Sequence, residues 1–168
     1  MDYYQAVVID YLRADRAIFL NTECCIQLED KENPDDCDPH WYCDAVALDF
    51  RNTMIFLCEI SFAEKLESMA KRLRAWTDNW QNIRQALERD SKVSSLKGWE
   101  LRPWLFVPKE TIPLLLKRLD KMKGSDGHLV FRPRITPLEC TQPWLYRSWN
   151  HRDEDTNKPD SIPVAMRF

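Results

Sequence analysis

The stretch WYCDAVALDFRNTMIFLCEIS, residues 41–61, decides the fold that we expect for this chain. It holds two apolar runs, 45–48 and 54–60, which are rich in β-branched and aromatic residues. The residues between the runs are mostly polar, with Arg51-Asn52 at their centre. Two such runs joined by a short polar segment predict a β-hairpin.

The pairing of the two strands would bring two acidic residues together. A three-residue turn would shift the pairing by one position and separate them, whereas a symmetric turn places them on one face about 5 Å apart. Like charges in direct opposition weaken a hairpin, and a divalent cation between them would remove that penalty. The simpler alternative is a pair of strand-end acids facing solvent. A turn symmetric about Arg51-Asn52 predicts these pairs: Leu48–Ile55, Val46–Leu57 and Asp44–Glu59.

The composition is that of an ordinary globular domain. The chain has 168 residues, of which 44% are hydrophobic and 30% charged. We expect one α/β domain over residues 1–149 and a polar tail over 150–168. The net charge is −3, and the acidic segment 29–39 carries more than all of it. The remainder is slightly basic, which permits a polyanionic partner without requiring one.

The cysteines and the hydropathy favour a cytoplasmic protein. Six cysteines show no CxxC pair and no Cys/His spacing typical of zinc sites. No stretch approaches the ~18–20 apolar residues that a membrane span needs, and the sequence shows no signal-peptide pattern. We therefore expect a protein of the reducing cytoplasm that makes no membrane contact.

The rest of the chain predicts helices and strands on either side of the hairpin. Ser61-x-x-Glu64 matches a capping box at the start of a long helix. Trp76 and Trp80 lie in the apolar stripe of that helix, so we expect them in the core. Pro133 should push the residues after it to an edge of the sheet or off it. The expected elements besides the hairpin are a helix over 2–15, a strand over 17–28, a helix over 61–87, a buried strand over 102–107, a helix over 111–123 and a short strand over 128–132.

The resulting order, α-β-β-β-α-β-α-β, predicts a mixed sheet of four or five strands between helices. Over roughly residues 1–107 this order resembles the PD-(D/E)xK, or restriction-endonuclease-like, superfamily. Cys43-Asp44 would match "PD", and Glu59-Ile60-Ser61 would match "(D/E)xK". The resemblance implies a nuclease in which Asp44, Glu59 and Ile60 hold Mg²⁺ or Mn²⁺ where the phosphodiester is cleaved. Ser61 departs from the motif, because it replaces the lysine that helps activate the attacking water and stabilises charge.

Another cation has to replace that lysine if the protein is active. Lys65 lies four residues after Ser61, one turn along the expected helix, and helical side chains lean toward the N-terminus. Lys65 is therefore our first candidate, with Lys71 or Arg72 next. The alternative is that Lys65 is an ordinary solvated lysine on the face of the helix.

Other charged residues are weaker candidates. Asp10 or Glu23 could supply a further acid, whereas alternation makes Asp49 a turn residue. A basic cluster at 117–123 is either a solvated helix face or a track for phosphates; it comprises Lys117, Arg118, Lys121 and Lys123.

The favoured function is therefore a Mg²⁺-dependent nuclease acting on nucleic acid, with DNA as the favoured substrate and Asp44, Glu59 and Lys65 as catalytic residues. The first alternative is a catalytically inactive nuclease-fold domain that binds nucleic acid or a protein partner. The second is an unrelated α/β protein in which the two acids are incidental. A homodimer or a partner subunit is compatible with each of these.

Overall fold

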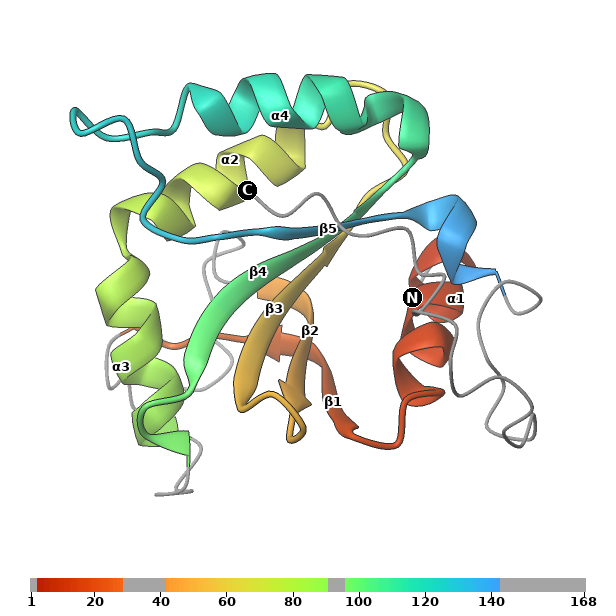
Figure 1. The fold of residues 1–168 in the computed structure, drawn as a ribbon, viewed down its shortest axis with the longest axis vertical. Helices are drawn as coiled ribbons and strands as arrows, with labels where there is room; N and C mark the ends of the chain where they lie inside the picture. Colours follow the sequence, from red (N-terminus) through yellow and green to blue (C-terminus); the bar gives the residue numbers. More distant parts are fainter. Residues whose placement is uncertain (1–2, 29–41, 91–95, 143–168) are drawn as a thin grey trace, which may run out of the picture.

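The computed structural model describes residues 3–28, 42–90 and 96–142 (Figure 1). The predicted acidic loop at 29–39 and the predicted tail at 150–168 lie outside these ranges. The described elements are α1 (Tyr3–Arg13), β1 (Ile18–Cys25), β2 (Tyr42–Asp49), β3 (Met54–Ile60), α2 (Glu67–Asp78), α3 (Trp80–Asp90), β4 (Glu100–Val107), the 3-10 helix η3 (Lys109–Thr111), α4 (Ile112–Asp120), β5 (Arg134–Pro137) and the 3-10 helix η4 (Leu138–Thr141).

The five strands form one mixed sheet in the order β1-β2-β3-β4-β5. The first three strands are antiparallel neighbours. β4 pairs parallel with β3, and β5 pairs parallel with β4, each after a connection through helices. The prediction of an α/β fold with a mixed sheet flanked by helices is confirmed.

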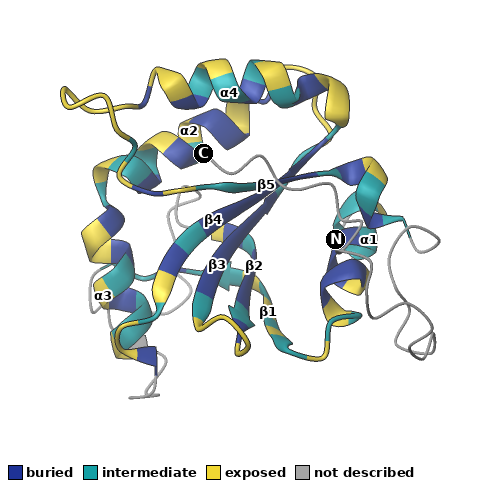
Figure 2. Ribbon diagram, viewed as in Figure 1, coloured by how far each residue is buried: buried dark blue, intermediate teal, exposed yellow. Residues whose placement is uncertain are grey.

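Alternate residues of the strands build two apolar layers, one on each face of the sheet. Helix α1 covers one layer, and α2, α3 and α4 cover the other. Figure 2 shows β3 and β4 buried along the middle of the sheet. Trp76 and Trp80 pack in the layer beneath α2 and α3, as their place in the apolar stripe predicts.

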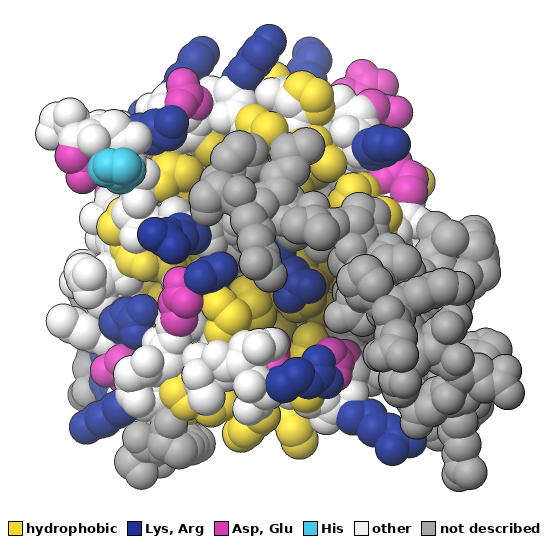
Figure 3. All heavy atoms as spheres, in the orientation of Figure 1, with side chains coloured by type: hydrophobic (Ala, Val, Ile, Leu, Met, Phe, Trp, Pro, Cys, Tyr) yellow, Lys and Arg dark blue, Asp and Glu magenta, His cyan; other side chains and the backbone are white. Residues whose placement is uncertain are grey.

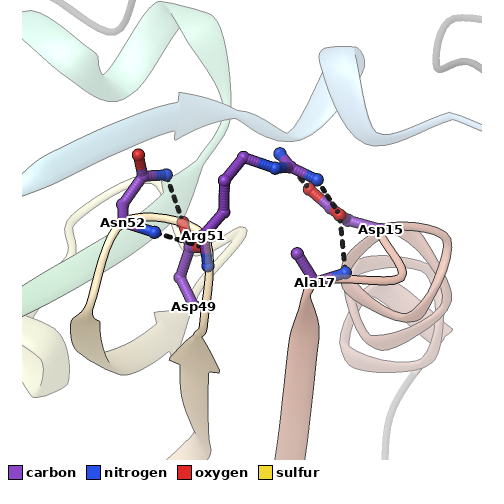
Figure 4. Close-up of polar contacts among 5 residues, drawn as sticks. All are labelled: Asp15, Ala17, Asp49, Arg51 and Asn52. Atoms are coloured by element: carbon purple, nitrogen blue, oxygen red, sulfur yellow. Dashed lines mark hydrogen bonds and ion pairs between the residues drawn. The ribbon is translucent and has the colours of Figure 1, made fainter.

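The hairpin has the register expected from a symmetric turn, because Val46 pairs with Leu57 and Leu48 pairs with Ile55. The carboxylate of Asp49 fixes the turn that joins β2 and β3. It accepts the N–H groups of Arg51 and Asn52 at 3.0 and 3.2 Å and the Asn52 side-chain amide at 2.7 Å (Figure 4). Asp49 is thus the turn residue that alternation predicts.

A second contact ties the hairpin turn to the N-terminal part of the chain. The Arg51 guanidinium donates to Asp15 at 2.9 Å, and the same carboxylate accepts the N–H of Ala17 at 2.9 Å (Figure 4). The end of α1, the start of β1 and the turn are therefore held together at one end of the sheet.

The predicted helix over 61–87 is wrong at its start and in its middle. Helix α2 begins at Glu67, after Leu66 in a left-handed conformation with φ 50°. Ser61 continues the sheet, because its N–H donates to the carbonyl of Phe106 at 2.9 Å. The Ser61 hydroxyl accepts the N–H of Ala63 in a local turn instead of capping a helix. Ser61 therefore continues the hydrogen bonding of the sheet and does not form the predicted capping box.

The helix also ends at Asp78 and begins again at Trp80. The N–H of Asn79 donates to the carbonyl of Trp76, and the Asn79 side chain donates to the carbonyl of Ala75. An asparagine that bonds the preceding turn offers the backbone an alternative to a regular helix. The apolar stripe nevertheless continues across the break, because Ile83 is buried in the same layer as Trp80.

The predicted strand over 128–132 is also wrong, and β5 lies at Arg134–Pro137 instead. Phe131 leaves the sheet because its ring packs on Trp80, with ring centroids 4.9 Å apart. β5 is held on β4 by Trp104, whose indole N–H donates to Thr136 at 2.9 Å and whose ring lies 3.9 Å from the Arg134 guanidinium. The residues after Pro133 thus form the edge strand, as expected of them.

None of the helices in the described ranges has the length and apolar character that crossing a bilayer requires. Cys43 and Cys58 are buried free thiols, whereas Cys25 is disulfide-bonded. A disulfide persists mainly in oxidising compartments. The cytoplasmic location stays a prediction.

Candidate functional site

The candidate site lies where β2 and β3 separate. Their pairing ends at Ala45 and Cys58, while β3 continues beside β4 as far as Ile60. The carboxylate of Asp44 fills the gap, because its Oδ2 accepts the N–H of Ile60 at 2.7 Å. Its Oδ1 accepts the side-chain amide of Gln5, from α1, at 3.2 Å. The Asp44 side chain therefore links β2 to β3 where the backbone pairing of these strands ends.

The backbone is irregular on the other side of Asp44 as well. Glu23 of β1 lies opposite Asp44, between the pairs Thr22–Ala45 and Cys24–Cys43, and has φ 54°. A left-handed conformation is uncommon for a residue other than glycine. Such conformations gather at functional sites, where the surrounding structure holds them. Both neighbouring strands therefore depart from regular pairing at Asp44.

Glu59, near the end of β3, forms a buried ion pair with Arg72 of α2. The Glu59 residue is only 2% exposed. One guanidinium nitrogen, Nη1 of Arg72, lies 2.7 Å from Oε1 and 2.5 Å from Oε2 of the carboxylate. The Arg72 side chain is 25% exposed, so it extends from the carboxylate to the surface. Helix α2 thus supplies a cation directly at Glu59.

The electrostatics of this pair are unfavourable for a carboxylate. Burial raises the pKa of Glu59 to about 8, the charge of Asp44 raises it too, and Arg72 opposes both. Burial lowers the pKa of Arg72, but the charges of Glu59 and Asp44 outweigh this and raise it overall. A buried acid whose pKa is perturbed by desolvation and by a second acid is a signature of functional sites.

The stability of the protein should depend on pH through Glu59. The pKa of Glu59 is higher in the folded chain than its ordinary value of 4.5. Its stabilising contribution is therefore complete below about pH 4.5 and is lost as the pH rises to about 8. We expect the free energy of unfolding, measured with urea across this range, to fall in the wild type and to vary much less in Glu59→Gln.

Glu100→Gln is the matched control for this prediction. Glu100 also pairs with an arginine, Arg102, at 2.7 Å, but its side chain is half exposed. Its variant should keep the pH dependence of the wild type. Parallel curves for the wild type and Glu59→Gln would contradict the assignment of the pH dependence to Glu59.

Comparisons with protein-family models, with curated proteins and with solved structures found no match. The site therefore has to be judged on its own geometry.

The predicted role of Lys65 loses its structural basis. Lys65 is exposed and lies in the irregular segment 61–66, so the argument from one helical turn is wrong. Its carbonyl accepts a hydrogen bond from Arg118 of α4 at 2.5 Å. This contact fixes the backbone of the segment, and the structure gives the Lys65 side chain no contact with Glu59.

Arg72, the second-rank candidate, lies next to Glu59. One signal in the sequence could have ranked it first. Arg72 lies three residues after Met69 and four before Trp76, both of which are buried. This spacing places Arg72 on the core-facing side of the helix. An arginine is seldom buried unless it is paired, and Glu59 is the acid at the end of the preceding strand.

The other charged candidates lie on the surface. Asp10 is exposed and forms an ion pair with Arg13, at 3.9 Å, along α1. The basic residues of α4 face a shallow groove beside α2, and Figure 3 shows Lys and Arg side chains projecting along the α4 side of the molecule. The basic residues lining this groove are Lys71, Arg74, Lys117, Arg118 and Lys121.

The described residues contain no group of three or more His, Cys, Asp or Glu side chains placed to hold a metal ion. Among the described residues, β2 and β3 bring the acids Asp44 and Glu59 to this site. Mg²⁺ is commonly bound by one or two carboxylates, with water completing its shell. The two acids fit such a site in kind and number, and the binding of Mg²⁺ to them stays a prediction.

Proposed function

We propose that this chain is a restriction-endonuclease-like domain that hydrolyses phosphodiester bonds of nucleic acid, with DNA as the favoured substrate and Mg²⁺ or Mn²⁺ as the cofactor. One observation carries the proposal: the buried carboxylate of Glu59 lies at the strand end next to Asp44, with the Arg72 cation on it.

The arrangement of the strands supports this proposal. Three antiparallel strands, a helical connection and a parallel fourth strand occur in the order that the resemblance implies. Asp44 lies near the start of β2 and Glu59 near the end of β3, and antiparallel strands bring these two positions to the same end of the sheet. The two motif acids therefore come from the elements that the superfamily uses.

Asp44 and Glu59 would hold the metal ion, and Ile60 keeps Asp44 in place through its N–H. A bound Mg²⁺ supplies polarisation of the phosphoryl oxygen and a lowered pKa for a bound water. Arg72 would then be released from at least one oxygen of Glu59. Its guanidinium, partly exposed and always charged, suits the negative charge that develops on a phosphate during cleavage. Arg72 thus replaces Lys65 in our assignment of the missing cation.

The second candidate is the inactive nuclease-fold domain, and a specific observation favours it. All four carboxylate oxygens of Asp44 and Glu59 already accept hydrogen bonds from the protein. Such a network gives every carboxylate oxygen a hydrogen-bond donor without a metal ion. A domain of this kind would bind nucleic acid or a partner without cleaving anything.

Thermal unfolding in Mg²⁺ separates the two candidates. A cation that binds only the folded chain stabilises it by about 2.7 kcal/mol at a hundred times its dissociation constant. For a chain of this size each kcal/mol corresponds to roughly 2–4 °C in Tm. We expect millimolar Mg²⁺ to raise the Tm of the wild type by several degrees and to leave Asp44→Asn unchanged.

Glu100→Gln is again the control and should respond to Mg²⁺ as the wild type does. In parallel, the wild type should cleave plasmid, linear or single-stranded DNA, or RNA, in Mg²⁺ or Mn²⁺, and Glu59→Gln should not. A wild type that shows neither the rise in Tm nor cleavage would overturn the nuclease proposal in favour of the inactive domain.

A further inference from the structure

Exposed aromatic side chains lie close in sequence to the residues of the candidate site. Tyr42 is 43% exposed and lies two residues before Asp44, and Phe62 is 52% exposed and lies three residues after Glu59. Tyr3, which is 68% exposed, lies two residues before Gln5, the partner of Asp44. Three separate segments that build the site thus each present an aromatic ring to solvent.

Two of these segments are joined by ring stacking. The rings of Tyr4 and Phe62 have centroids 4.6 Å apart and an interplanar angle of 28°. Tyr3 packs edge-on against Tyr4 at 5.4 Å. Phe62 remains half exposed although Tyr4 covers one side of its ring. The arrangement is one near-parallel pair of rings, Tyr4 and Phe62, with Tyr3 edge-on beside it and exposed to solvent.

A second aromatic cluster on the molecule has a different geometry. Phe19, Phe50 and Trp99 meet edge to face, with interplanar angles of 67° and 83°. Phe50 belongs to the turn between β2 and β3, so this cluster lies at the opposite end of the hairpin from the carboxylates. Phe19 and Phe50 are as exposed as the rings near the site. They therefore provide a control for exposed aromatic surface as such.

Two exposed lysines follow closely in sequence after the strand ends at this side of the sheet. Lys65 is exposed three residues after Phe62, and Lys109 is exposed two residues after the end of β4. β4 ends beside β3, because Ile60 pairs with Phe106. Flat aromatic faces combined with lysines are the combination that binds single-stranded nucleic acid, in which the faces of the bases are free.

We propose that Tyr3, Tyr4 and Phe62 form a stacking platform for unpaired bases, which directs single-stranded nucleic acid to Asp44, Glu59 and Arg72. This inference rests on the proposed function for its purpose, but binding can be measured without cleavage. In a duplex the faces of the bases are covered by their neighbours, so the platform selects single strands.

The test measures fluorescence anisotropy of a labelled oligothymidine of about 12 nucleotides, and of a hairpin duplex of the same length, in buffer with EDTA. The wild type should bind the single strand more tightly than the duplex. Phe62→Ala should weaken binding of the single strand by about 10-fold and leave duplex binding almost unchanged. Phe50→Ala, at the other aromatic cluster, should bind as the wild type does.

Two further variants of Phe62 distinguish stacking from apolar contact. Phe62→Tyr keeps a flat ring and should bind the single strand as the wild type does, whereas Phe62→Leu should behave like Phe62→Ala. Equal binding by Phe62→Leu and the wild type would overturn the platform, and so would an equal loss in Phe50→Ala. A wild type that binds no single strand would also overturn the platform. That result is expected if the rings instead contact a protein partner.

Failure of the stacking platform and failure of the nuclease proposal give different results, because binding and cleavage are measured separately. Preferential binding of the single strand without cleavage in Mg²⁺ or Mn²⁺ would support the platform and contradict the nuclease. Cleavage of duplex DNA without any preference for single strands would support the nuclease and overturn the platform.

Discussion

Arg72→Gln is expected to lower the free energy of unfolding by about 3 kcal/mol at about pH 8. The variant leaves Glu59 buried without its cation, so Glu59 must either keep an unpaired charge or take up a proton at a pH where the unfolded chain is ionised. Removing one member of a buried pair therefore costs far more than removing a surface pair. The loss should be smaller at about pH 5, because Glu59, with its pKa raised to about 8, then holds a proton and needs no cation. Urea unfolding of both proteins at the two pH values measures the difference.

Two further proteins make this result interpretable. In Arg72→Gln combined with Glu59→Gln, the total loss should be clearly smaller than the sum of the two single losses, because the pair acts as a unit. Arg102→Gln removes the more exposed ion pair with Glu100 and should cost about 0–1 kcal/mol. If Arg72→Gln costs no more than Arg102→Gln, the buried pair does not hold α2 on the sheet.

The second large effect concerns the proposed cleavage of nucleic acid. Arg72→Gln should reduce turnover by at least about 10²-fold, comparable to the loss of one preorganised electrostatic group. Lys65→Ala should leave turnover at saturating substrate close to that of the wild type, because Lys65 lies in the segment 61–66 and not on the helix that faces Glu59. Turnover on labelled substrate, at a temperature where circular dichroism shows every variant folded, gives the comparison.

Ser61→Lys tests the same assignment in the opposite direction. Added to Arg72→Gln, it restores the lysine of the motif and should recover part of the lost cleavage. A large loss in Lys65→Ala together with full activity in Arg72→Gln would show that Lys65, and not Arg72, supplies the cation.

The hairpin could be predicted because its determinants are local. Side chains alternate with a period of two, and the turn between Asp49 and Met54 leaves few alternative registers. Val46, Leu48 and their partners therefore lie where the pattern places them. The buried β4 was predictable for a related reason, because a nearly continuous apolar run is typical of a strand covered on both faces.

The start of α2 could not be predicted from local pattern, because two local rules competed. Ser61 fits a capping box, but its N–H is also the next donor in the hydrogen-bond ladder between β3 and β4. In the structure this N–H donates to β4, and no capping box forms. The position of Arg72 depends on where the helix begins, so the error at Ser61 favoured Lys65 over Arg72. The contact of Phe131 with Trp80, which removes 128–132 from the sheet, joins residues far apart in sequence.

The strand order has a consequence for self-association. β1 and β5 are the two edges of the described sheet, and an open edge can recruit a strand from another molecule. β5 is short and lies between Pro133 and its own last residue, Pro137, neither of which donates a backbone hydrogen bond. β1 bends at Glu23, which breaks the straight row of donors that an incoming strand needs. Both edges of the described sheet are therefore poor templates for an added strand, which disfavours a dimer that shares this sheet through β1 or β5.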